Sequence, residues 1–289
     1  MRVLITGSNG QLGSEIKELS NIYDKLEFVF KDLPDLNICD ANFLNTFILE
    51  NNINAVINCA AYTAVDKAED DVEISEQVNV KGVLNLVNAL KKVNGKLIHI
   101  STDYVFDGSN SEPYKESDKV NPLGVYGKTK RDGELFVIKS AIDSIIIRTS
   151  WLYSSFGKNF VKTMYRLGNE KNSLSIISDQ IGTPTYARDL AKVCLDIISI
   201  SDTKRISSNG KVYHYSNEGV TSWYDFACSV MELSGSNCKV KAIQTIDYPT
   251  IAKRPHYSVL NKAKIKNDFN IEIPYWKESL KDCIDKLKQ

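Results

Sequence analysis

Residues 2–13 read RVLITGSNGQLG, an apolar run rich in β-branched residues that leads directly into three glycines spaced Gly-x-x-Gly-x-x-Gly. This pattern predicts a buried strand, a tight turn and a helix that begins near Gln11. Glycines at such a turn let the backbone approach a diphosphate, and the helix N-terminus supplies N–H donors and the positive end of its dipole. We therefore predict that Gly7, Gly10 and Gly13 bind a dinucleotide.

Similar short apolar runs recur through the first half of the chain and alternate with helical patterns. They cover residues 27–30, 55–58, 96–101 and 144–149. Because these runs are unbroken, they are typical of strands buried on both faces of a parallel sheet. The sequence therefore predicts an α/β fold with a doubly wound, Rossmann-like parallel sheet.

The second half is less regular, with helices expected at about 159–167, 188–198, 222–233 and 276–287. We expect residues 1–150 to form the dinucleotide-binding domain, with its sheet completed by about 187–216. Residues 151–186 and 217–289 are expected to form a smaller C-terminal α/β lobe that binds the substrate.

Composition excludes several classes of protein. The 289 residues contain 36 Lys plus Arg and 36 Asp plus Glu, so the net charge is zero and an extended nucleic-acid footprint is not expected. No apolar stretch approaches the roughly 18 residues of a membrane span, and Gly7 comes too early for a signal peptide. The six cysteines form no Cys-x-x-Cys pair and the three histidines are far apart, so we expect neither disulfides nor a metal site, and a cytoplasmic location.

The end of the second predicted strand bears on the choice of dinucleotide. An acidic residue there binds the adenosine ribose, whereas a basic residue accommodates a 2′-phosphate. Lys31 and Asp32 present both charges. The sequence therefore does not choose between NAD and NADP.

Tyr126 and Lys130 lie four residues apart on a predicted helix, so their side chains share one face. A tyrosine can donate a proton to a carbonyl that is being reduced if its pKa falls from about 10 towards 7, which takes about 4 kcal/mol. A lysine charge about 4 Å away supplies roughly that amount. Thr102, at the end of the fourth predicted strand, is placed to hydrogen-bond the carbonyl oxygen.

These residues resemble those of the extended short-chain dehydrogenase/reductases and, within them, of the dTDP-4-dehydrorhamnose reductase family. The resemblance covers nearly the whole chain. Beyond the glycine turn, Tyr126 and Lys130, it rests on residues 58–69, 102–106, 148–151, 158–164, 179–185 and 252–255.

The resemblance implies reduction of the C4 ketone of dTDP-4-dehydro-L-rhamnose with NADPH or NADH. Tyr126 would protonate the sugar's C4 oxygen, Lys130 would lower the pKa of the tyrosine and hold the nicotinamide ribose, and Thr102 would position the carbonyl. Asp103 and Trp151 would contact the sugar. The residues expected to line the cofactor are Gly10, Gln11, Leu12, Asn37, Ile38, Ala60, Ala61, Tyr62 and Thr63.

Other expectations concern ions and partners. A dianionic diphosphate needs local cations, and Lys253 and Arg254 are candidates for this role. Some members of the family bind Mg²⁺ through acidic residues at a contact between two subunits, so a homodimer is consistent with the resemblance. Only Glu15 lies near such a place, and we predict no metal site.

Three alternatives remain. A dehydratase on this scaffold uses an Asp-Glu pair after the threonine, where this chain has Asp103 and Tyr104, which favours reduction. A reductase of another 4-keto-6-deoxy nucleotide sugar stays open. So does a noncatalytic NADP-binding subunit like the regulatory subunit of methionine adenosyltransferase, although Thr102, Tyr126 and Lys130 are all present. No Gly-x-Ser-x-Gly motif supports a serine hydrolase.

Overall fold

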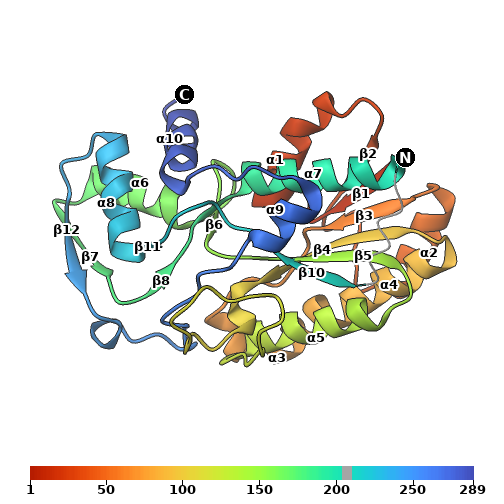
Figure 1. The fold of residues 1–289 in the computed structure, drawn as a ribbon, viewed down its shortest axis with the longest axis horizontal. Coiled ribbons are helices and arrows are strands. Elements are labelled where there is room, and N and C mark those ends of the chain that lie inside the picture. The colour runs from red at the N-terminus through yellow and green to blue at the C-terminus, as the bar shows by residue number, and fades with distance from the viewer. Residues whose placement is uncertain (204–209) are drawn as a thin grey trace.

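The computed structural model describes residues 1–203 and 210–289 (Figure 1). Within these ranges six parallel strands form one sheet in the order β10-β5-β4-β3-β1-β2. The strands are β1 (Arg2–Thr6), β2 (Glu27–Lys31), β3 (Ala55–Asn58), β4 (Lys96–Thr102), β5 (Asp143–Thr149) and β10 (Lys211–His214). The chain moves outward from β1 to β2, then returns to the other side of β1 with β3. The predicted doubly wound α/β fold is confirmed.

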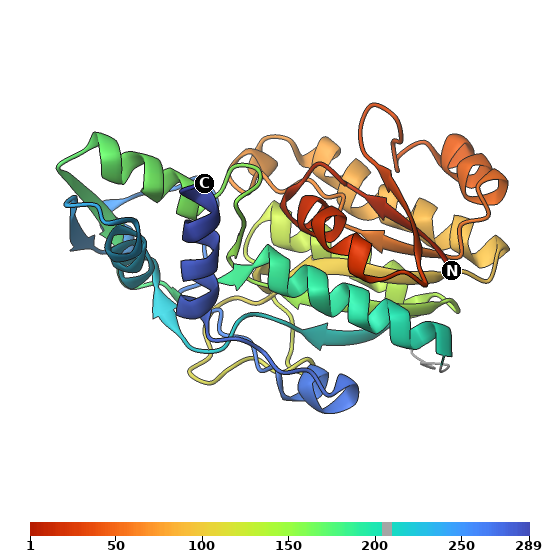
Figure 2. The ribbon, with the colours of Figure 1, turned by 90° about the horizontal axis from the view of Figure 1, so that it is seen from above.

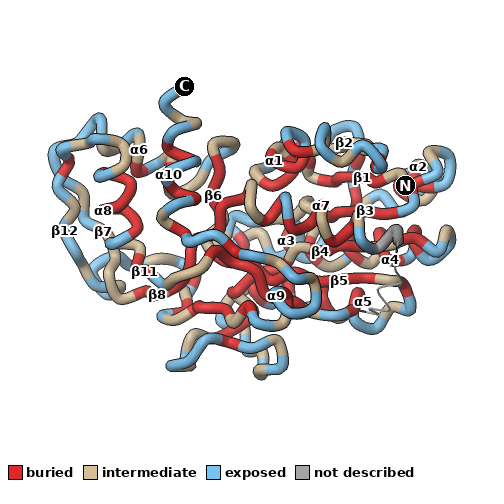
Figure 3. The backbone as a smooth tube through the Cα atoms, turned by 45° about the horizontal axis from the view of Figure 1, so that its top comes forward, coloured by how far each residue is buried: buried red, intermediate tan, exposed pale blue. Residues whose placement is uncertain are grey.

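Helices cover both faces of this sheet (Figure 1). Alternate residues of β1 point to opposite faces: Ile5 packs in the cluster that includes α1 (Gln11–Leu19) and α7 (Ala187–Thr203). Leu4 packs in the cluster that includes α2 (Ala41–Glu50), α4 (Val83–Lys92) and α5 (Val125–Lys139). Because both faces are covered, β1 and β3 to β5 are largely buried (Figure 3), which explains their unbroken apolar sequences.

The helix that precedes β4 is interrupted. It starts as α3 (Val72–Glu76), passes through a π-helical segment at Gln77–Gly82 and continues as α4. Such π-type turns inside helices are frequent at functional sites. Here the segment buries Asn79, whose side chain holds a loop of the cavity described below.

Part of the second half forms a lobe that extends from one end of the sheet, whereas α7 and β10 belong to the sheet and its cover (Figure 2). Its helices α6 (Phe160–Glu170), α8 (Trp223–Ser234) and α10 (Trp276–Leu287) pack around an aromatic cluster. Three short strand pairs accompany them: β6 (Leu152–Tyr153) with β9 (Thr185–Tyr186), β8 (Ile181–Gly182) with β11 (Thr221–Ser222), and β7 (Ser173–Ile177) with β12 (Lys239–Ile243). Helices α9 (Ala263–Phe269) and α2 were not predicted. In the described residues no helix has the length and apolarity to cross a membrane.

Candidate active site

A cavity of about 750 Å³ opens at the carboxyl ends of β1, β3, β4 and β5. This is the place where an open α/β sheet binds its ligands, because the strand order reverses between β1 and β3. Residues from the second half, including Trp151 and Trp223, complete the opposite wall. The cavity is therefore shared between the two halves of the chain.

The glycine turn forms one end of the cavity. Gly7 has a left-handed backbone (φ +61°), and a Cβ there would lie 2.7 Å from the Ala60 nitrogen. A Cβ on Gly13 would lie 2.5 Å from the Ser8 Cα, so Gly13 packs behind the turn and does not line the cavity. Gly7, Gly10, Gln11 and Leu12 do line it, and Gly10 caps α1 without a side-chain hydrogen bond. The first residues of α1 therefore lie at the end of the cavity, beside Gly7 and Gly10, where the helix N-terminus fits a diphosphate.

The two charged residues at the end of β2 behave differently. Asp32 lines the cavity and accepts a hydrogen bond of 2.8 Å from the Asn9 nitrogen, which ties β2 to the glycine turn. Lys31 does not line the cavity, and its Nζ lies 3.8 Å from Asp35 Oδ2. Asn37 and Ile38 continue the same wall. The acidic residue, not the basic one, is therefore presented to the cavity.

The loop after β3 forms the next part of the wall, through Ala60, Ala61, Tyr62 and Thr63. The backbone nitrogen of Tyr62 donates to Asn79 Oδ1 at 2.9 Å, and Asn79 Nδ2 donates to the backbone oxygen of Tyr62 at 3.1 Å. The π-helical segment thus acts as a support for this loop, because it turns the Asn79 amide towards the loop backbone.

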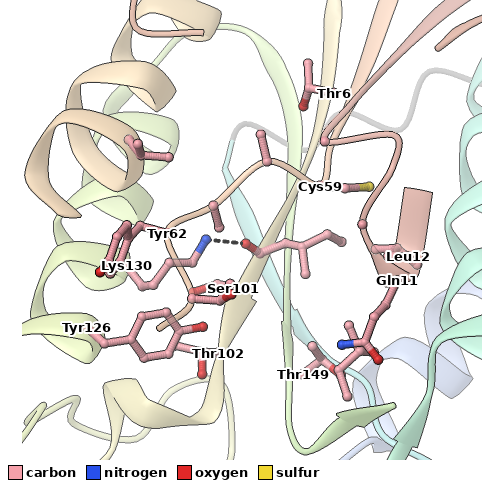
Figure 4. Close-up of a pocket in the computed structure, with 18 of the residues that line it drawn as sticks. Thr6, Gln11, Leu12, Cys59, Tyr62, Ser101, Thr102, Tyr126, Lys130 and Thr149 are labelled. Atoms are coloured by element: carbon pink, nitrogen blue, oxygen red, sulfur yellow. Dashed lines mark hydrogen bonds between the residues drawn. The ribbon is translucent and has the colours of Figure 1, made fainter. Parts of the chain in front are cut away.

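Tyr126 and Lys130 reach the cavity from the start of α5, and Thr102 reaches it from the end of β4 (Figure 4). The Tyr126 ring packs edge-on against Tyr104, with 5.5 Å between centroids. Burial raises the pKa of Tyr126 to about 12, and a hydrogen bond with Thr102 opposes the rise. The phenol is therefore protonated at neutral pH.

Lys130 Nζ donates a hydrogen bond of 2.7 Å to the backbone oxygen of Ile100, and burial lowers the pKa of Lys130 to about 8. We expected this lysine to bring the pKa of Tyr126 close to 7. That expectation is wrong for this structure, because desolvation of the phenol dominates and the lysine is itself buried and bonded to β4.

The far end of the cavity contains Asp103 and Trp151. Asp103 is buried, which raises the pKa of its carboxyl group to about 6, although hydrogen bonds from Ser258 and Thr102 oppose the rise. Trp151 stacks on Trp223 with 3.7 Å between ring centroids and 9° between planes. This end offers a buried acid beside a flat aromatic surface.

Lys253 and Arg254, the cations expected beside a diphosphate, do not line the cavity. Arg254 instead makes two hydrogen bonds, of 2.6 and 3.1 Å, with the Asp66 carboxylate. This ion pair joins the C-terminal segment to the loop that follows β3.

Sequence reasoning missed several residues that line the cavity, among them Lys158, Asn159 and Trp223. Asn159 caps α6 and its Nδ2 donates to Gln11 Oε1 at 2.9 Å, so the start of α6 contacts the start of α1. The Asn-capped start of a predicted helix was the signal for Asn159. A single tryptophan at a helix start gave no sign that Trp223 belongs to the site.

Glu15 lies outside the cavity lining. It is fully buried, accepts a hydrogen bond of 2.6 Å from Ser154 and lies 3.3 Å from Arg188. Within residues 1–203 and 210–289, no three His, Cys, Asp or Glu side chains are grouped so that they could hold a metal ion.

The comparisons with known proteins agree with this geometry. The family model described as RmlD substrate binding domain matches residues 1–289. A dTDP-4-dehydrorhamnose reductase from Aggregatibacter actinomycetemcomitans is 41% identical over 290 residues, covering 97% of each chain. The chain belongs to the dTDP-4-dehydrorhamnose reductase family.

Solved structures from this family share the whole fold. A dTDP-4-dehydrorhamnose reductase from Clostridium acetobutylicum superposes with a TM-score of 0.93 at 42% identity, covering 100% of both chains. The dTDP-4-dehydrorhamnose reductase from Bacillus anthracis, solved in complex with NADP, superposes with a TM-score of 0.91 at 36% identity, covering 99% of each chain. The predicted family and the assignment as an oxidoreductase are confirmed.

Proposed function

We propose that this chain reduces the C4 ketone of dTDP-4-dehydro-L-rhamnose to dTDP-L-rhamnose, with NADPH or NADH as reductant. The observation that carries the proposal is the convergence of Thr102, Tyr126 and Lys130 on one wall of a cavity whose other end is the glycine turn. Membership of the dTDP-4-dehydrorhamnose reductase family supports the same substrate.

The cofactor fits the residues that are present. Gly7, Gly10 and the first N–H groups of α1 would hold its diphosphate, since both glycines and the start of the helix line the cavity. Asp32, Asn37 and Ile38 would line its adenosine end. When bound, a nicotinamide dinucleotide supplies the hydride that becomes the new C–H bond at C4.

Tyr126 supplies the proton. Its raised pKa keeps the hydroxyl protonated at neutral pH, so it can give that proton to the carbonyl oxygen as negative charge develops there. Thr102 orients the same oxygen, and Lys130, which also lines the cavity, would hold the ribose of the bound nicotinamide. One hydride and one proton are added, and the ketone becomes an alcohol.

The remaining wall would bind the nucleotide sugar. Asp103 can accept hydrogen bonds from sugar hydroxyls, and Trp151 offers an aromatic side chain to the sugar. Lys158 brings an exposed cation to the cavity, which suits a diphosphate. We accordingly propose that residues 1–150 bind the cofactor, with sheet completion by 187–216, and that 151–186 and 217–289 bind the substrate. The six free cysteines fit a reducing, cytoplasmic setting.

The test is loss of absorbance at 340 nm with NADPH and then NADH, using dTDP-4-dehydro-L-rhamnose, followed by chromatography of the sugar nucleotide. The proposal expects one mole of cofactor oxidised per mole of dTDP-L-rhamnose formed. If the protein binds NADPH but oxidises it only with a different 4-keto-6-deoxy nucleotide sugar, or not at all, the rhamnose assignment is contradicted.

A further inference from the structure

Two tryptophans from distant parts of the chain form one face of the cavity. Trp151 follows β5, and Trp223 is the first residue of α8. Their rings are nearly parallel, with 9° between planes and 3.7 Å between centroids. Both residues line the cavity and also pack against the core cluster behind them, so the stack is a part of the wall that the core supports.

The backbone and one glycine fix the position of Trp151. Its φ is +47°, a left-handed conformation that is rare for a bulky residue and persists only where the surroundings hold it. A Cβ on Gly182 would lie 2.6 Å from Trp151 Cε2 and 2.7 Å from Trp151 Cζ2, so one face of the indole packs directly onto bare backbone. That face therefore has a fixed support, and the opposite face needs another.

The support for the face is Trp223. Thr221 pairs with Gly182 in the β11–β8 ladder, which brings the start of α8 next to the glycine that carries Trp151. Ser222 then caps the helix by accepting a hydrogen bond of 3.0 Å from the Asp225 nitrogen. Behind Trp223 lies the Phe160 ring, 4.6 Å away between centroids, and Phe160 does not line the cavity. One strand pair thus delivers both supports of the Trp151 ring.

We propose that Trp223 is a positioning residue for substrate binding, which holds the Trp151 indole immobile against Gly182 in the wall that contacts the sugar of the nucleotide sugar. This inference rests on the proposed function. A preordered indole contacts the sugar without losing side-chain freedom, whereas a mobile Trp151 loses it at every binding event. Trp223 therefore acts on substrate affinity through Trp151 and leaves cofactor binding and proton transfer unchanged.

The first experiment compares Trp223→Leu, Trp223→Phe and a matched control, Phe160→Leu, which loosens the same aromatic cluster from behind. We expect Trp223→Leu to raise KM for the nucleotide sugar about tenfold, with kcat and the NADPH Kd within about twofold. Trp223→Phe retains a stacking ring and should recover most of the loss. Phe160→Leu should leave KM within about twofold. Equal changes in Trp223→Leu and Phe160→Leu would overturn the proposal, since general loosening would then explain the effect.

The second experiment tests whether Trp223 acts through Trp151. Trp151→Leu, Trp223→Leu and the double variant form a cycle. Because Trp223 matters only by holding Trp151, the double variant should raise KM by less than about twofold beyond Trp151→Leu. Multiplied effects would overturn the inference. If Trp223→Leu does not fold, as judged by circular dichroism, Trp223→Met replaces it in the same cycle, because it also removes the stacking ring. Failure of the wild type to turn over this sugar would instead contradict the proposed function.

Discussion

The two ends of the cavity are built in different ways. At the cofactor end, a single contiguous segment forms the surface: the turn from Gly7 to the start of α1 depends on Gly7, where a Cβ would clash with the Ala60 backbone. At the sugar end the surface consists of side chains from separate elements, Asp103 after β4, Trp151 after β5 and Trp223 on α8. The first end depends on local geometry, and the second depends on how distant elements pack.

The largest expected effect is on the chemistry between these two ends. Tyr126→Phe removes the hydroxyl that donates the proton, so we expect kcat to fall by about 10²- to 10⁴-fold while the NADPH Kd changes less than about twofold. Stopped-flow loss of absorbance at 340 nm measures the first quantity and fluorescence titration the second. Tyr275→Phe, a half-exposed tyrosine outside the cavity lining, is the control and should keep wild-type kcat. A Tyr126→Phe enzyme with wild-type kcat would contradict the assignment of the acid.

The next largest effect is on cofactor affinity alone. Gly7→Ala places a Cβ 2.7 Å from the Ala60 nitrogen at φ +61°, whereas Gly235→Ala places one in open space at φ +76°. Both incur a left-handed strain of about 1–2 kcal/mol in unfolding free energy, measured in urea. Only Gly7→Ala should weaken NADPH binding, by about tenfold or more, because the turn must shift. Equal NADPH affinities for the two variants would show that the turn does not depend on close approach.

At the sugar end, pH should reveal the buried carboxyl of Asp103. Burial raises its pKa from 3.8 to about 6, so between these values the folded state binds more protons than the unfolded state. Stability contributed by this group is present at low pH and is lost as pH rises through about 6, by up to about 3 kcal/mol. Asp103→Asn removes this dependence. Urea unfolding should therefore show that the unfolding free energy of Asp103→Asn, relative to that of the wild type, is higher at pH 7.5 than at pH 4. A difference between variant and wild type that is the same at both pH values would contradict this prediction.

The smallest effect concerns the ion pair between the two halves. Arg254 is bound by Asp66, so Arg254→Met and Asp66→Asn should each reduce stability by about 1 kcal/mol or less, and the double variant should lose no more. We expect all three to raise KM for the nucleotide sugar equally, by less than about threefold. A much larger rise in Arg254→Met than in Asp66→Asn would mean that Arg254 contacts the diphosphate directly.

The same contrast explains what could be predicted from the sequence. Local patterns predict five strands, the glycine turn and the helix that carries Tyr126 and Lys130. This is possible because a short stretch of sequence indicates both a strand buried on two faces and the start of a helix. The π-helical segment that supports Tyr62 was not predicted, because it inserts into an ordinary helical pattern. The raised pKa of Tyr126 was missed because desolvation depends on the packing of the whole cavity.

Long-range contacts account for the other omissions. Trp223 reaches the cavity because β11 pairs with β8. Arg254 lies outside the cavity lining, where its guanidinium binds the Asp66 carboxylate. Neither pairing leaves a pattern in a single sequence. Arg254, a candidate cation of the site, therefore lies outside the cavity lining, and Trp223, which was not predicted, is part of that lining.

The division of the cavity into a backbone-built cofactor end and a side-chain-built sugar end is tested most directly by crossed binding measurements. Calorimetric titration of NADPH and of dTDP-L-rhamnose is made on the wild type, Gly7→Ala and Trp223→Leu. We predict that Gly7→Ala weakens NADPH by about tenfold or more and dTDP-L-rhamnose by less than about twofold, and that Trp223→Leu does the reverse. If each variant weakens both ligands equally, the two ends are not separate and the account is contradicted.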